Sequence, residues 1–356
     1  MATLNNLRHF HMYSGNSVKH KRTNMRTSLR SVFIACIALE ILALGIVVYK
    51  LYVSMHTPRR SGVGPVVVLN SHYLSASPSA ALRYYYEYKP DTVEYDSPSW
   101  LSYTAIHTYN HDGLNDRYDY AVTKPADTFR IVALGDSFTY GEHVNTADSW
   151  PEKLEDRLGS SCTAKKHYEV INLGVAGYDV QYIAHRYEVR GVKYHPDLII
   201  WFESGSGFDR LSEISAQYTK LLSAQPGSSS SETTIKRSDG RITNVMYDRV
   251  MAEVHARYSD QLISDMVEAS WQEFFRARDS TKTVIAMFGV EPVVNKLKLA
   301  YWARDQKNVW VDPAITDIYD TPGMSLPDFH PSAIGHDRIA SDLLTYILAN
   351  KLVPCK

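Results

Sequence analysis

Residues 130–141 read Arg-Ile-Val-Ala-Leu-Gly-Asp-Ser-Phe-Thr-Tyr-Gly, and this stretch decides the fold. It begins with a short apolar run, which is typical of a buried β-strand, and then breaks into a turn that carries Asp136 and Ser137. An apolar pattern with helical spacing follows from about residue 150. A serine on such a strand-to-helix turn can be held as an exposed nucleophile, although Asp136, Ser137 and Thr139 could equally be helix-capping residues.

Apolar runs and helical stretches alternate from Phe129 to the C-terminus. We expect helices near 149–158, 180–190, 247–278, 291–305 and 332–352, and strands at Ile131–Leu134, Tyr168–Leu173, Leu198–Phe202, Val284–Phe288 and Val309–Val311. The alternation predicts an α/β fold, a flavodoxin-like three-layer α/β/α domain with a five-stranded parallel sheet. Binding sites in such sheets lie beyond the carboxyl ends of the strands.

The N-terminal region has the charge pattern of a membrane anchor. Residues 1–30 contain basic side chains and no acidic ones, and residues 31–53 are apolar except for Glu40 and Lys50. The apolar run is longer than that of a typical signal peptide, and it has no polar face of the kind that a core helix shows. We therefore predict a cytoplasmic tail, a single transmembrane helix and an extracytoplasmic remainder, because basic flanks stay in the cytoplasm.

The rest of the chain divides by composition. Residues 54–80 are rich in Pro, Gly and Ser and are interpreted as a stalk. Residues 81–128 are rich in Tyr, Asp and Pro without a clean period, and are interpreted as an irregular extension packed on the main domain. Residues 129–356 form the predicted main domain, with a flexible insertion at 224–242.

Charge and composition limit the ligands. The formal net charge of −1 gives no general electrostatic attraction for nucleic acid. The three cysteines lack the spacing of a metal site, and His107 and His111, in the polar extension, are interpreted as surface residues and not as metal ligands. We expect neither a metal nor an organic cofactor. The sequence does not indicate an oligomeric state.

Three loops that should meet at the carboxyl edge of the sheet have complementary chemistry. The first carries Ser137, the second spans residues 172–178 and includes Gly177, and the third spans residues 326–332. A serine hydroxyl needs a base to take its proton, a histidine can do so near neutral pH, and a carboxylate can orient that histidine. The Gly-x-Ser-x-Gly motif of α/β-hydrolases is absent around Ser137.

These loops resemble the sequence blocks of the SGNH/GDSL hydrolases. Gly135–Thr139 is similar to the first block, Asn172–Gly177 to the second and Asp328–Pro331 to the final one, and the resemblance covers about residues 129–350. It implies that Ser137 is the nucleophile, that His330 is the base oriented by Asp328, and that the N–H groups of Ser137 and Gly177 hold the oxyanion.

The chain departs from the family pattern in two places. Asp328 precedes His330 by two residues, where the family usually has three, and position 327 is Pro. In the third block the family has an Asn that donates to the oxyanion, and Ser206 stands at that place. Losing such a donor costs about 10²–10³ in rate. Either Ser206, a shorter donor, therefore replaces the Asn, or another group enters the site, or the activity is low.

The predicted topology also brings two cysteines together. In this sheet order the first and last helices of the domain flank the same face and run parallel. Cys162 lies just beyond the first of these helices and Cys355 just beyond the last. The sequence therefore predicts a disulfide between Cys162 and Cys355.

The resulting prediction is a membrane-anchored serine esterase. It would cleave acetyl or short acyl esters of a small molecule or, by analogy with the predicted location, of a surface glycan. An O-acyltransferase acting on a polysaccharide would use the same three residues, so this alternative stays open. The missing Asn favours a further alternative, a catalytically weak protein of this fold that binds or assembles glycans.

Overall fold

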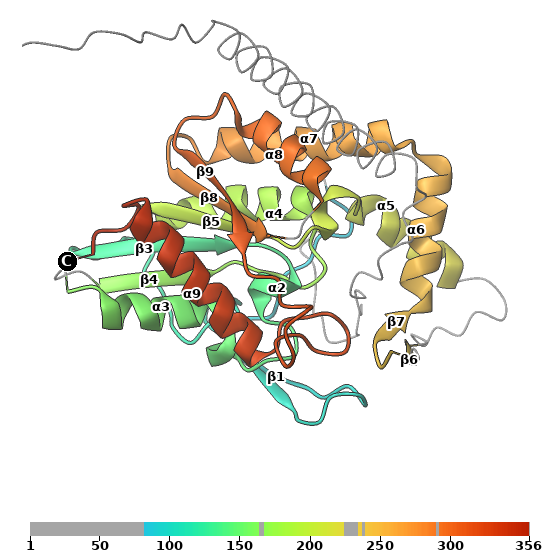
Figure 1. Cartoon of the computed structure of the whole chain (residues 1–356), viewed down its shortest axis with the longest axis horizontal. Coiled ribbons are helices and arrows are strands. Elements are labelled where there is room, and N and C mark those ends of the chain that lie inside the picture. The colour runs from blue at the N-terminus through green and yellow to red at the C-terminus, as the bar shows by residue number, and fades with distance from the viewer. Residues whose placement is uncertain (1–81, 164–166, 224–233, 237–238, 290–291, 356) are drawn as a thin grey trace, which may run out of the picture. The chain divides into compact units, whose positions relative to one another are not determined.

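The computed structural model describes residues 82–163, 167–223, 234–236, 239–289 and 292–355 (Figure 1). Its main sheet has five parallel strands in the order β4-β3-β5-β8-β9. The strands are β3 (Thr128–Leu134), β4 (His167–Asn172), β5 (Leu198–Glu203), β8 (Lys282–Phe288) and β9 (Val309–Ile315). The α/β class, the five strands and the flavodoxin-like order are confirmed.

Helices cover both faces of this sheet. They are α2 (Ser137–Tyr140), α3 (Trp150–Ser161), α4 (Val180–Arg186), α5 (Ser212–Ser223), α6 (Val245–Arg257), α7 (Asp260–Ala277), α8 (Val293–Ala303) and α9 (Ala333–Ala349). The helix expected over 247–278 is two helices, because Tyr258 is extended and Ser259 caps α7 by accepting the Leu262 N–H. The predicted insertion carries a small hairpin of β6 (Thr234–Lys236) and β7 (Ile242–Asn244), and the sequence did not predict α5.

Alternate residues of each central strand pack into two separate hydrophobic cores, one on each face of the sheet. In β3, Ile131 and Ala133 pack with α3 and α9, whereas Val132 and Leu134 pack with α4 and α7. Figure 1 shows α3 and α9 on one side of the sheet and α4, α7 and α8 on the other. Burial of each large apolar side chain contributes about 1.5–3 kcal/mol, so a continuously apolar strand is stable only when both faces are covered.

The extension before the sheet packs on the main domain as predicted, but part of it is regular. It contains an antiparallel hairpin of β1 (Thr92–Asp96) and β2 (Ala105–Tyr109). The ring of Tyr88 stacks on those of Tyr109 and Tyr140, with centroids 4.6 and 5.0 Å apart. The extension therefore shares a core with the sheet domain.

The predicted tail, anchor and stalk (1–30, 31–53 and 54–80) lie outside the described residues. Within the part of the chain that the structure describes, no helix combines the length and the apolar character needed to cross a bilayer. The anchor therefore stays a prediction from the sequence.

A disulfide joins the C-terminal ends of α3 and α9. Cys162 is the residue that ends α3, and Cys355 follows α9. Their sulfur atoms are 2.07 Å apart and their Cα atoms 4.5 Å apart. The predicted pair is thus bonded in the structure.

Candidate active site

Ser137 sits at the start of α2, directly after β3. Asp136 caps this helix, since its Oδ1 accepts the Phe138 N–H at 3.0 Å. Gly135 leaves no room for a side chain, because a Cβ there would lie 2.1 Å from Thr139 Oγ1 and 2.9 Å from the Phe202 carbonyl. The small residues of the motif are therefore required by the tight turn that holds the serine.

His330 and Asp328 form a hydrogen-bonded dyad in the loop before α9. Nδ1 of His330 lies 2.7 Å from Oδ2 of Asp328. Phe329 adopts a left-handed backbone with φ of 77°, which is uncommon for a non-glycine residue. The loop is closed by the Leu326 N–H, which donates to the His330 carbonyl at 2.7 Å. This bend brings a carboxylate only two residues away onto the imidazole ring.

The dyad lies against the serine turn. The rings of His330 and Phe138 have centroids 5.5 Å apart, and Phe138 follows Ser137 directly. Nε2 of His330 is buried and has no hydrogen-bond partner among the described residues, so no hydrogen bond joins it to Ser137. Bonds of this kind commonly tighten only when substrate binds. The imidazole of His330 thus packs against the residue that follows Ser137, and its Nε2 has no hydrogen-bond partner among the described residues.

Gly177 lies in a turn that the extension holds in place. The Tyr178 N–H donates to the Val175 carbonyl at 3.3 Å, and Gly177 between them has φ of 80°. The Ala176 N–H donates to Tyr88 Oη at 3.3 Å, and the Tyr86 hydroxyl donates to the Ala176 carbonyl. The two tyrosines therefore fix the backbone on which the predicted oxyanion donor sits.

Ser206 uses its hydroxyl elsewhere. Its Oγ donates to Oδ2 of Asp136 at 3.1 Å, and Ser204 Oγ donates to the same oxygen at 2.6 Å. The buried Glu203 holds this loop further by accepting the N–H groups of Gly205 and Gly207. In this arrangement the single proton of Ser206 is directed at Asp136 and not at the oxyanion position.

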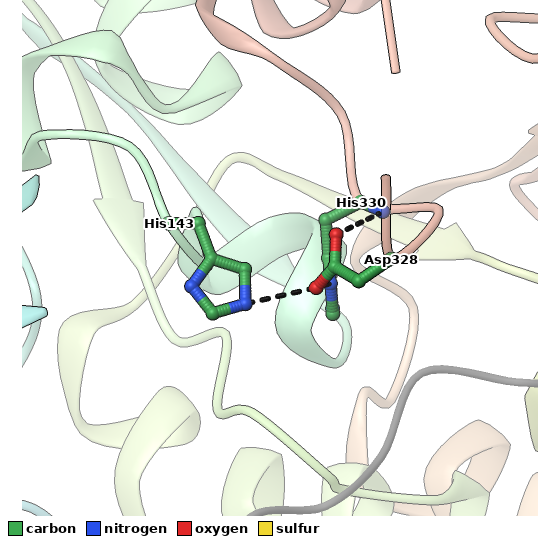
Figure 2. Close-up of side chains that lie close together, drawn as sticks. All are labelled: His143, Asp328 and His330. Carbon is green, nitrogen blue, oxygen red and sulfur yellow. Dashed lines mark hydrogen bonds and ion pairs between the residues drawn. The ribbon is translucent and has the colours of Figure 1, made fainter. Parts of the chain in front are cut away.

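Two residues that the sequence did not indicate complete the cluster. Nε2 of His143 lies 2.9 Å from Oδ2 of Asp328, and Nδ1 of His143 lies 2.5 Å from Oδ2 of Asp96. Figure 2 shows His143 and His330 meeting at the carboxyl group of Asp328. Asp96 comes from β1 and His143 from the loop after α2, so no local motif contains both.

The charges of this cluster reinforce one another. Burial alone would lower the pKa of His143, but hydrogen bonds to Asp328 and Asp96 raise it well above its ordinary value. Burial alone would raise the pKa of Asp328, and the neighbouring His330 and His143 hold it far below its usual range. The cluster therefore favours an ionised Asp328 beside a protonated His143.

The nitrogen and oxygen atoms of the cluster are at hydrogen-bonding distances from one another. His143, Asp328 and His330 could in principle hold a metal ion. A tetrahedral site with bonds of about 2.1 Å separates its ligand atoms by about 3.4 Å. The contacts of 2.7 and 2.9 Å at Asp328 are shorter, so they accommodate protons and not a cation.

His107 and His111, the other two candidate histidines, lie in different environments. His107 is buried, so its interpretation as a surface residue is wrong; burial lowers its pKa to about 4, and its Nδ1 shares a hydrogen bond of 2.9 Å with Tyr140 Oη. His111 is exposed and lies 3.1 Å from Asp91. Each has its own hydrogen-bond partner, and neither is hydrogen-bonded to Asp328.

Comparisons with known proteins give a family match and distant structural likenesses. The model of the GDSL-like lipase/acylhydrolase family matches residues 133–338. No curated protein matches the chain. Among solved structures, the psychrotrophic esterase EstA from Pseudoalteromonas sp. is 12% identical, with 62% of this chain and 98% of that one covered and a TM-score of 0.40. The lipase/acylhydrolase from Enterococcus faecalis is 17% identical, with 64% and 100% covered and a TM-score of 0.35.

Proposed function

The chain belongs to the GDSL-like lipase/acylhydrolase family, and from this premise we propose that it is a serine esterase with Ser137 as its nucleophile. The observation that carries the proposal is the dyad of the buried His330 and the partly buried Asp328 beside the Ser137 turn. Nε2 of His330 is unpartnered among the described residues. A base in this state can accept the serine proton.

The proposed reaction is acyl transfer to water. Ser137 Oγ attacks the ester carbonyl carbon while His330 Nε2 takes the serine proton and then gives it to the leaving alcohol. Asp328 keeps the imidazole in the required tautomer and stabilises its protonated form. The N–H groups of Ser137 and Gly177 hold the oxyanion, and Ser206 joins them only if its hydroxyl turns away from Asp136. Water, activated by His330, then hydrolyses the acyl-serine ester.

The substrate and the location form a second part of the proposal. We propose that the ester is acetyl or short-chain and that it is borne by a small molecule or a surface glycan. The support is the apolar segment 31–53 behind the basic segment 1–30, which would place the domain outside the cytoplasm. Protease accessibility of the domain in intact cells tests this location.

Hydrolysis of p-nitrophenyl acetate by the full-length protein tests the activity. We expect Ser137→Ala and His330→Ala each to lower kcat by at least about 10³-fold, because each removes an essential member of the triad. Ser160→Ala is the matched control, since this serine is exposed on α3 and its hydroxyl bonds only to the Arg157 carbonyl. Equal rates for the parent and Ser137→Ala would contradict the proposed mechanism.

A weakly active, glycan-binding protein is the second candidate. The observation that favours it is the hydroxyl of Ser206, which donates to Asp136 and leaves the oxyanion with backbone donors alone. In that case the full-length protein would hydrolyse the ester no faster than Ser137→Ala does, yet it would bind an acetylated polysaccharide in a pull-down assay.

A further inference from the structure

We propose that Asp96 and His143 form a positioning pair that holds the catalytic dyad of Asp328 and His330, an inference that rests on the proposed esterase function. Neither residue lies in the three sequence blocks that resemble those of the SGNH/GDSL hydrolases. Both lie in the part of the site where the hairpin β1–β2 meets the loop before α9.

The hydrogen-bond geometry carries this proposal. Both ring nitrogens of His143 face carboxylate oxygens, at 2.5 Å from Asp96 and 2.9 Å from Asp328. An ionised carboxylate only accepts hydrogen bonds, so both nitrogens must carry protons. A neutral imidazole could satisfy only one of the two carboxylates. His143 is therefore an imidazolium that bridges Asp96 and Asp328.

Side chains from several elements surround the His143 bridge. Tyr103 donates its hydroxyl to the His143 carbonyl at 2.8 Å, and the ring of Trp100 meets that of His143 edge-on at 4.8 Å. The titratable groups that act on His143 come from β1, β2, its own loop and the loop before α9: Asp96, His107, Glu142, Asp328 and His330. Only about 8% of His143 is exposed, so these interactions are weakly screened.

The bridge has two consequences for catalysis. The shared oxygen of Asp328 is fixed by two donors, His330 Nδ1 and His143 Nε2, so the dyad is rigid before substrate arrives. The bridge also keeps Asp328 ionised, because His330 and His143 hold the pKa of this carboxyl far below its usual range.

The pH dependence of kcat/KM distinguishes this role from a merely structural one. We expect His143→Gln to move the acidic limb of the profile to higher pH, because Asp328 loses one of the two groups that hold its pKa low. We also expect kcat to fall by about 10–100-fold, because Asp328 loses its second anchor. Asp96→Asn should move the limb in the same direction but less far, since it weakens the bridge without removing it.

His111→Gln is the matched control for these variants. It alters an exposed histidine of the same extension that pairs with Asp91 and not with Asp96 or Asp328. We expect the acidic limb of this variant to coincide with that of the parent. Circular dichroism with thermal melts shows whether each variant is folded. If the acidic limb does not move in folded His143→Gln and Asp96→Asn, the proposal is overturned.

A measurement without substrate separates this inference from the esterase proposal. In the full-length protein labelled with ¹⁵N-histidine, NMR at pH 8 should show one imidazole with both nitrogens protonated, and His143→Gln should remove that signal. Finding it in a protein without esterase activity would retain the bridge and reject the esterase function. A His143 ring that titrates near its ordinary value of about 6.5 would overturn the bridge even in an active enzyme.

Discussion

Asp136 shows how one side chain of the nucleophile turn can order two loops without taking part in proton transfer. One carboxylate oxygen caps α2 through the Phe138 N–H, and the other accepts the hydroxyls of Ser204 and Ser206. A charged acceptor with three donors ties the loop after β5 to the loop after β3. The position of Ser206 is therefore set by Asp136, which sits in the first block of the motif.

Ser206→Ala measures whether the hydroxyl of this serine also reaches the oxyanion. We expect kcat for p-nitrophenyl acetate to fall by less than about tenfold, because the Ser206 proton is directed at Asp136 and backbone donors remain for the oxyanion. Ser204→Ala is the control, since it removes the neighbouring hydroxyl bond to the same carboxylate oxygen. A loss of about 10²–10³ in Ser206→Ala alone would show that this hydroxyl does turn to the transition state.

At the scale of elements, the parallel strands were predictable because their burial is uniform. Every residue of β3 and β5 is buried, and each strand contains an uninterrupted apolar run, at Ile131–Leu134 and Leu198–Phe202. The hairpin is different, since in β2 the polar His107 faces inward while Ile106 is exposed. A period-2 pattern with a buried histidine and an exposed isoleucine gives no amphipathic signal. Tertiary contacts, and not local pattern, decide the faces of this hairpin.

Tyr88→Phe tests whether the extension supports the oxyanion turn. The change removes the Oη that accepts the buried Ala176 N–H at 3.3 Å and keeps the ring that stacks between Tyr109 and Tyr140. Leaving a buried N–H unpaired costs about 1–3 kcal/mol, so we expect a lower melting temperature and a several-fold lower kcat.

Tyr118→Phe is the control for this experiment. Tyr118 belongs to the same extension but is exposed, so the same loss of a hydroxyl should change neither the melting temperature nor kcat. If Tyr88→Phe matched Tyr118→Phe in both measurements, the extension would have no part in holding the turn.

At the scale of the whole molecule, the candidate site combines segments that are far apart in the chain. Ser137, Gly177 and His330 were predictable because each follows a strand or precedes a helix at the same edge of one sheet. Asp96 and His143 were not, because they are 47 residues apart and meet only through the packing of the hairpin on the sheet. A local sequence motif indicates which side chains lie on one element. The contact between Asp96 and His143 depends instead on how two elements pack against each other.

The disulfide acts on the same scale, because it links the chain just after α3 to the chain just after α9. It joins residues 193 positions apart, and the entropy model assigns a loop of this length about 5 kcal/mol of stabilisation, often less in practice. The segment after α9 is also anchored by the buried Leu352 and Val353 and by the Tyr168 hydroxyl, which donates to the Pro354 carbonyl. These contacts should keep the domain folded after reduction, so that only its stability falls.

Denaturant unfolding of the full-length protein with and without dithiothreitol tests this expectation, with fluorescence of the buried Trp150, Trp201 and Trp271 as the signal. We expect the reducing agent to lower the midpoint for the parent and for Cys36→Ser alike. The double variant Cys162→Ser/Cys355→Ser should unfold at the lower midpoint under both conditions, because it has no bond to reduce. Thiol titration shows whether the reducing agent has opened the disulfide. If the midpoint of the parent is unchanged after the bond has opened, a stabilising role is contradicted. The packing of α3 against α9 would then hold the C-terminus unaided.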